Sequence, residues 1–167
     1  ELVEAVDVAQ EQGGLGVLAE RAAGVDLVLT SGGVSAGAYE VVKDALADRG
    51  VTFGKVAMQP GGPQGAGRLD GGVAVVTLPG NPVSAQVSFE VFVRPALRSA
   101  LGHPYPERPV VLARLAQRLT SPSGRRQYRR GVLDAREGTV AEIGGPPSHL
   151  LGSMAKADCL IVVPSLE

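Results

Sequence analysis

Two junctions, about fifty residues apart, constrain most strongly how this chain can fold. In each, a short apolar run ends in a turn of small residues where a helix can begin. The first is VDLVLTSGGVSAG (residues 25–37) and the second is VAVVTLPGNPVS (residues 73–84). Ligands bind at the carboxyl ends of the strands in an open α/β sheet, and helix N-termini favour anions. The junctions therefore predict an anion-binding α/β domain, with a phosphorylated small molecule as its ligand.

Strands and helices are expected to alternate in the first hundred residues, which predicts parallel strands joined by crossovers. Asn81 is a good N-cap and Pro82 a good first helical residue. Residues 60–67 are rich in Gly and Pro and are predicted to be a loop. In chain order, the predicted elements are a helix over 15–23, a strand over 25–30, a helix over 38–49, a strand over 51–58, a strand over 73–78 and a helix over 83–101.

The pattern changes after residue 104, where a domain boundary is predicted. The following segments are short and β-like, apart from a helix over 148–157, and they cover 110–119, 126–133, 139–143 and 160–163. About sixty residues are marginal for independent stability, so this unit is expected to pack against the first one or against a partner chain. Three predicted strands are fewer than doubly wound sheets usually have, so the first unit is expected to be incomplete.

Charge and hydropathy exclude several classes of protein. The net charge of −1 gives no reason to expect nucleic acid or an anionic membrane as a partner. No apolar run approaches the ~20 residues that span a bilayer, and no secretory signal is visible, so a cytoplasmic location is expected. Cys159 is the single cysteine and lies beside an apolar run, which favours an inert, buried thiol. The chain begins with Glu1, which suggests a fragment.

The turns at these junctions, called here the first corner (residues 30–35) and the second corner (residues 78–84), support interpretations of different strength. At the first corner, glycines could bring backbone N–H groups close to an anion, but a structural strand-to-helix turn explains the same residues. Neither the Rossmann spacing nor a P-loop Gly-Lys-Ser/Thr is present. At the second corner two prolines bracket Gly80-Asn81 and stiffen the turn, as a small-ligand site requires.

Other charged residues allow a structural and a functional interpretation. Glu40 and Lys43 make either an i,i+3 surface pair or a place for Mg²⁺ beside the crevice. Lys55 and Arg68 are either solvated cations or groups that neutralise phosphate. The arginines around Tyr128 make either a solvated strand face or a contact to an anionic substrate. The lone histidines have no partners at ligand spacing, so a zinc site is rejected, and no nucleophile–base pair is visible.

Several motifs together resemble one family. TSGGVS (30–35), KVAM (55–58), LPGNPVSA (78–85) and FVRP (92–95) occur in this order, followed by RQYRRGVL (126–133), SHLL (148–151) and LIVVP (160–164). The chain resembles the molybdopterin molybdenumtransferases, the family of MoeA and the gephyrin E domain. The resemblance implies a MogA-like three-layer α/β domain with a mostly parallel sheet, truncated at its N-terminus, over residues 1–104. A small β-rich domain is implied over residues 105–167.

The resemblance also implies a reaction and a set of site residues. Family enzymes insert molybdate into adenylylated molybdopterin and cleave the adenylate with Mg²⁺, and the full-length proteins form homodimers. Catalytic roles are implied for Glu40, Pro79 and Pro82, with Glu40 also as the metal ligand. Substrate binding is implied for Thr30, Ser31, Gly32, Gly33, Ser35, Lys43, Lys55, Gly80, Asn81 and Ser84.

The chain departs from the family pattern at two places. The family often has Asp at the position of Glu40, and its loop usually reads Lys-Pro-Gly-Lys-Pro where this chain has Gln59-Pro60-Gly61-Gly62-Pro63. Two alternatives to the insertase therefore stay open. One is a binding fragment that needs further N-terminal domains for catalysis. The other is an adenylyltransferase of the MogA type, which the β-rich unit and the LPGNP motif argue against.

Overall fold

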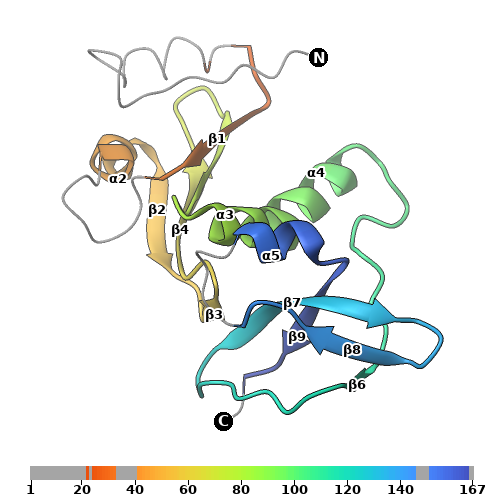
Figure 1. Ribbon diagram of the computed structural model, residues 1–167. Helices are drawn as coiled ribbons and strands as arrows, with labels where there is room; N and C mark the ends of the chain where they lie inside the picture. Colours follow the sequence, from red (N-terminus) through yellow and green to blue (C-terminus); the bar gives the residue numbers. More distant parts are fainter. Residues whose placement is uncertain (1–21, 23, 33–40, 146–150, 166–167) are drawn as a thin grey trace.

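The first sheet lies in the upper left of Figure 1, and the two strands that pair in parallel each lead into one of the corners. The computed structural model describes residues 22, 24–32, 41–145 and 151–165. In the described part, the first sheet has four strands in the order β1-β5-β4-β2. Strands β1 and β5 pair in parallel, whereas β4 pairs antiparallel with both β5 and β2. The strands are β1 (Leu27–Ser31), β2 (Val51–Lys55), β4 (Pro63–Arg68) and β5 (Ala74–Leu78).

The helix after β5 begins as the sequence predicts. Asn81 is the N-cap and Pro82 the first helical residue, and the helix continues without a break to Ala100. Gly102, with a φ of 74°, follows this end, where a left-handed conformation commonly terminates a helix. The three parts of this helix are α3 (Pro82–Ser88), a π-helical turn (Phe89–Val93) and α4 (Arg94–Ala100).

The helix predicted over residues 38–49 is confirmed where it is described. It comprises α2 (Val41–Leu46) and a 3-10 turn (Ala47–Arg49), and Gly50 ends it in the left-handed conformation with a φ of 86°. The helix predicted over 15–23 lies outside the described residues except for Ala22, which is helical and buried.

The second sheet takes one of its strands from the first hundred residues. Strand β3 (Met58–Gln59) pairs in parallel with β7 (Arg126–Asp134), and Arg126 N donates to Ala57 O at 2.9 Å. Strand β7 also pairs antiparallel with β8 (Thr139–Glu142) and β9 (Cys159–Val163). The sheet is completed by β6 (Arg114–Leu115), which pairs with β8, and α5 (Leu151–Lys156) lies between this sheet and α3 in Figure 1.

Two apolar clusters hold these layers together. The first joins α2 to the first sheet through the buried side chains of Ala45, Leu46, Val51 and Val75. The second cluster packs α3 against β3 and the second unit, because Met58, Val83 and Val87 are buried against Tyr128, Met154 and Leu160. Burying such side chains contributes ~1.5–3 kcal/mol each, so the second cluster is a substantial part of what joins the two sheets.

The α/β class followed by a β-rich unit is confirmed, but the loop predicted over residues 60–67 is wrong. Residues 63–68 form β4, which lies inside the first sheet, and its two pairings make that sheet mixed where alternation had predicted parallel strands. A Cβ on Gly65 would lie 2.5 Å from Thr77 Oγ1 and 2.7 Å from the Phe53 ring. The strand uses glycine because neighbouring side chains fill the space beside its backbone.

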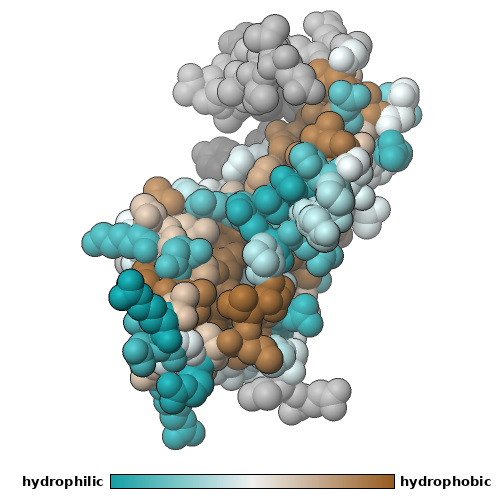
Figure 2. Space-filling model, turned by 90° about the vertical axis from the view of Figure 1, so that its right-hand side faces the viewer, coloured by the Kyte–Doolittle hydropathy of each residue, from teal (hydrophilic) through white to brown (hydrophobic). Residues whose placement is uncertain are grey.

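The connection between α4 and β6 exposes several large apolar side chains. Tyr105 is 81% exposed, Val110 86% and Leu112 100%. A strand was predicted over residues 110–119, but only β6 forms there, so most of that prediction is wrong. Figure 2 views the molecule from this side and shows hydrophobic surface at the upper right and in the centre of the lower half. No described helix is long and apolar enough to cross a membrane.

Candidate functional site

The two corners meet at one edge of the first sheet. Because β1 and β5 are parallel neighbours, with Ser31 opposite Leu78, their carboxyl ends lie side by side. Gly32 N donates to Leu78 O at 3.0 Å, and Ser31 Oγ donates to Pro79 O at 3.3 Å. The corners predicted to share a site are therefore bonded directly to each other.

Two glycines face each other where the corners meet. A Cβ on Gly80 would lie 3.1 Å from Gly32 Cα, which is tighter than an ordinary contact. Gly32 has a φ of 97°, a conformation that residues with a side chain rarely adopt. Glycine at position 80 leaves room for this approach, and glycine at position 32 allows the left-handed backbone of the turn.

The second corner is stabilised by hydrogen bonds between its own residues. Asn81 Oδ1 accepts from Ser84 N at 3.1 Å and from Ser84 Oγ at 3.3 Å, so both side chains are engaged in capping α3. Pro79 and Ser84 are buried, whereas Gly80 and Pro82 are exposed. The side-chain oxygen of Asn81 and the Ser84 hydroxyl thus shape the corner, and the exposed backbone at Gly80 is its open part.

The open part of the corner offers hydrogen-bond donors. Across the described chain, no hydrogen bond occupies the backbone N–H groups of Gly80 and Asn81. These amides stand at the N-terminus of a 19-residue continuous helix, where the helix dipole favours negative charge. The described corner residues include no Asp or Glu that would repel an anion.

Thr30 adds a polar atom that the described structure leaves unsatisfied. Its Oγ1 is buried and has no hydrogen-bond partner among the described residues. A buried hydroxyl without a partner costs ~1–3 kcal/mol, which makes it a candidate donor or acceptor for a ligand at this edge.

Lys55 lies at the same end of the strands as the corners, on β2. Strand β2 runs in the direction of β5, because both are antiparallel to β4, so Lys55 ends β2 where Leu78 ends β5. Two strand spacings, ~10 Å, separate them. The Lys55 side chain is exposed. Arg68, which one of the two interpretations also had neutralising phosphate, lies at the opposite end of the strands and donates to Gly72 O at 2.6 Å, so it does not act beside Lys55.

Four predicted site residues cannot be placed at the corners in this way. Gly33, Ser35 and Glu40 lie outside the described residues. Lys43 is half-buried on α2, which follows β1 after that segment. The catalytic and metal-binding roles predicted for Glu40 therefore stay predictions.

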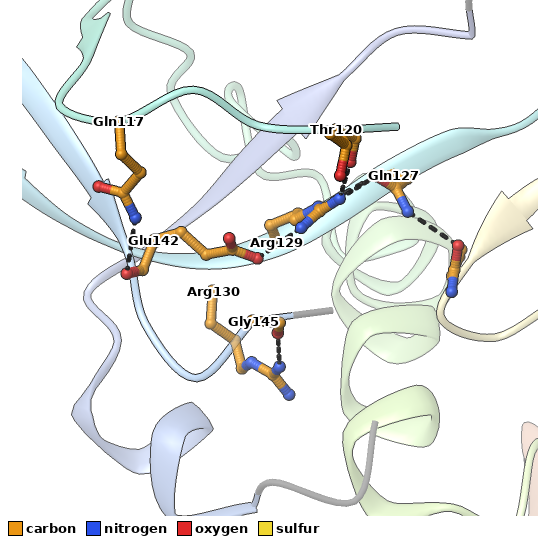
Figure 3. A network of polar contacts seen from close by, with 8 residues as sticks. Gln117, Thr120, Gln127, Arg129, Arg130, Glu142 and Gly145 are labelled. Carbon is orange, nitrogen blue, oxygen red and sulfur yellow. Dashed lines mark hydrogen bonds and ion pairs between the residues drawn. The ribbon is translucent and has the colours of Figure 1, made fainter. Parts of the chain in front are cut away.

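Two of the three arginines of β7 are buried, although one interpretation predicted a solvated strand face, and only Arg126 is exposed. Arg129 and Arg130 are 6% and 3% exposed. Arg129 Nη1 pairs with Glu142 Oε1 at 2.7 Å, and Arg130 Nη2 donates to Gly145 O (Figure 3). Burial lowers the pKa of Arg130, partly offset by the charge of Glu142. Sequence reasoning missed this buried network, whose only local signal is Gln127 between arginines on an otherwise polar strand.

Among the described residues, the remaining reactive side chains do not form a site. Burial, followed by the neighbouring Asp158 carboxylate, raises the pKa of the Cys159 thiol to about 11, which suits the inert role predicted for it. Within the described ranges, no three His, Cys, Asp or Glu side chains gather where they could hold a metal ion.

Comparison with known proteins gives two family matches. A model described as a probable molybdopterin binding domain matches residues 10–99, and a model of the MoeA C-terminal region (domain IV) matches residues 112–166. The chain is 56% identical over 166 residues to molybdopterin molybdenumtransferase 2 of Mycobacterium tuberculosis, covering 95% of this chain and 40% of that protein. It is 45% identical over 149 residues to molybdopterin molybdenumtransferase 1 of the same organism, covering 84% of this chain and 35% of that protein.

A solved structure agrees with these matches. The molybdopterin biosynthesis MoeA protein from Pyrococcus horikosii superposes with a TM-score of 0.72 at 29% identity, covering 95% of this chain and 38% of that one. The chain thus spans 40% or less of the length of these relatives.

Proposed function

This chain belongs to the molybdopterin molybdenumtransferase (MoeA) family, and on that premise we propose that its two corners bind the phosphate end of molybdopterin. The observation that carries the proposal is the convergence of the corners. The amides of Gly80 and Asn81, which no described group bonds, stand beside the Gly32 backbone, and Lys55 lies at the same end of the strands. Backbone N–H groups and a helix N-terminus are what a phosphate group prefers.

We further propose that the bound pterin is adenylylated molybdopterin and that molybdate is inserted into it as the adenylate is cleaved. The corner residues would contribute binding and orientation. The amides of the second corner would hold the anion in place, and Lys55 would attract the negatively charged substrates. The prolines proposed as catalytic would act by fixing the backbone: Pro79 is buried behind the corner, and Pro82 sets the first turn of α3.

Magnesium fits this site only in part. The described corner residues offer backbone groups and hydroxyls but no carboxylate, whereas Mg²⁺ usually takes one or two carboxylates together with substrate phosphates. Glu40 would be the carboxylate. No step above depends on the metal, and its presence stays a prediction, as do a homodimeric full-length protein and a cytoplasmic location.

Isothermal titration with molybdopterin tests the binding proposal. We expect saturable binding to the chain, and binding at least about tenfold weaker to a dephosphorylated pterin, because charge-assisted hydrogen bonds contribute ~1.5–3 kcal/mol. Equal affinity for both compounds would defeat the phosphate assignment.

Catalysis needs a separate assay, because the chain spans 40% or less of its relatives. Release of AMP from adenylylated molybdopterin, dependent on molybdate, tests it. Binding without AMP release supports the alternative of a binding unit, which the short coverage favours. ATP-dependent adenylylation of molybdopterin would instead support the MogA-type reaction.

A further inference from the structure

We propose that Gln127 and Arg129 of β7 are positioning residues for the candidate site, because they hold Gln59 and so fix the loop of residues 56–62 beside it. The inference rests on the proposed function and deepens it. It assigns the β-rich unit a role at a site whose other described groups belong to the α/β unit.

The loop lies at the same edge of the sheet as the corners. It leaves β2 after Lys55 and enters β4 at Pro63, and these two residues face each other across the base of the loop. Val56 N donates to Gly62 O at 2.8 Å, which closes the base. Any displacement of the loop is therefore transmitted to the backbone of Lys55.

One side of the loop packs on the helix that starts at the second corner. A Cβ on Gly61 would lie 2.6 Å from Ser88 Oγ and 3.4 Å from Ser84 O, so the loop backbone touches α3 directly. Gln64 Nε2 donates to Gly61 O at 2.8 Å and to Ser88 Oγ at 2.9 Å. These contacts fix the loop against the helix.

The other side is held to the second sheet by the short β3–β7 pairing and by one side-chain hydrogen bond. Gln127 is 2% exposed, and its Nε2 donates to Gln59 Oε1 at 2.8 Å. Its Oε1 accepts from Arg129 Nε at 3.0 Å and from Nη2 at 2.7 Å (Figure 3). A guanidinium group can only donate, so the amide oxygen of Gln127 must face Arg129 and its NH₂ group must face Gln59.

Arg129 is itself fixed by groups on two further segments. Its Nη1 pairs with Glu142 Oε1 on β8, with side chains 5% and 10% exposed, and its Nη2 donates to Thr120 O. The guanidinium therefore has one orientation, and it passes that orientation to Gln127 and then to Gln59. A small crevice lined by Gln59, Pro60 and Val83 of the first unit and by residues 127–130 of the second marks where the units meet.

Three variants separate positioning from simple stability. Gln59→Met keeps the length of the side chain but removes the acceptor for Gln127. Gln127→Glu keeps the acceptor for Arg129 but cannot donate to Gln59. Gln59→Lys combined with Gln127→Glu restores a donor–acceptor pair in the reverse direction, because lysine only donates and a carboxylate only accepts.

We expect each single variant to speed amide hydrogen exchange in residues 56–62, because the loop loses a buried hydrogen bond. Molybdopterin binding should weaken about tenfold, because the loop no longer fixes the groups beside the site. The double variant should return the affinity to within about threefold of the parent chain and restore slow exchange. Thermal unfolding of every variant shows how much of any change is global, and exchange in β5 serves as the internal control.

Single variants that lower only the melting temperature, with unchanged loop exchange and affinity, would overturn the proposal. So would a double variant that fails to restore the loop. A parent chain that does not bind molybdopterin would defeat the proposed function instead. Loop exchange needs no ligand and still tests the positioning: unchanged exchange in Gln59→Met would overturn it.

Discussion

Replacing Gly80 by alanine tests the contact on which the binding site depends. The added Cβ would lie 3.1 Å from Gly32 Cα and 3.7 Å from Gly32 N. Ordinary contact begins near 3.4 Å, so the corners must separate by a few tenths of an ångström. Gly32 N already donates to Leu78 O at 3.0 Å, which resists that movement.

The expected result is a loss of molybdopterin affinity with little loss of stability. A shift of a few tenths of an ångström uses up most of the ~0.5 Å within which binding groups must be held, so binding should weaken about three- to tenfold, or ~1 kcal/mol. Gly80 is exposed and its φ is not in the left-handed region, so alanine should change the free energy of unfolding by less than ~1 kcal/mol.

Gly54→Ala is the matched control. Gly54 also lies in the first sheet, on β2, and a Cβ there would meet nothing within 4 Å. It should leave affinity unchanged and raise stability slightly, because alanine restricts the unfolded chain. Titration calorimetry measures the molybdopterin affinity of the parent chain, Gly80→Ala and Gly54→Ala, and urea unfolding measures their stability. A Gly80→Ala chain that binds as tightly as the Gly54→Ala chain would refute the reasoning.

Three further predictions concern stability and reactivity. Gly65→Ala should destabilise the fold by ~1–3 kcal/mol in urea, because its Cβ would lie 2.7 Å from the Phe53 ring; an unchanged midpoint would contradict this packing. Glu142→Ala should cost ~3 kcal/mol or more, because it leaves the buried Arg129 charge unpaired, whereas Glu142→Gln should cost less; equal midpoints for both would count against it. The Cys159 pKa is raised from 9.0 to about 11, so at pH 8 the folded thiol should react with a disulfide reagent ~100-fold more slowly than in denaturant; equal labelling rates would argue against that environment. The thiol's contribution to stability should decline as the pH rises from 9.0 toward 11.

Local sequence was enough to predict the two corners. An apolar run, a small-residue turn and a capping residue follow one another within a few positions, so the strand end, the turn and the helix start are all encoded nearby. The Asn81 cap is confirmed by its bond to Ser84 N, and the juxtaposition of the corners follows because β1 and β5 pair in parallel.

Strand β4 could not be predicted because its glycines leave no side-chain pattern in the sequence. Gly65 and Gly67 carry no side chain that could show the alternation of a half-buried strand. Glycine is needed at these positions because neighbouring atoms fill the space that a side chain would occupy. These are the Phe53 ring beside Gly65 and the backbone at Gly50 and Val51 beside Gly67. Such a strand reads as a loop until its neighbours are known.

The buried network of the second unit was hidden for a different reason. Arg129 finds Glu142 13 residues away, and Gln127 finds Gln59 68 residues away. The sequence shows only clustered positive charge. Whether these arginines are exposed or buried depends on hydrogen-bond partners that are distant in the sequence and close in the fold.

Strand β3 has a consequence for anyone who wishes to move the β-rich unit into another protein. Its two residues, Met58 and Gln59, come from the other half of the chain yet complete the ladder beside Arg126 and Gln127. A graft that starts after residue 104 would leave part of β7 as a bare edge, ready to recruit a strand from a neighbouring molecule. A soluble transplant should therefore carry a short β3 substitute fused in parallel, and designs without one should aggregate.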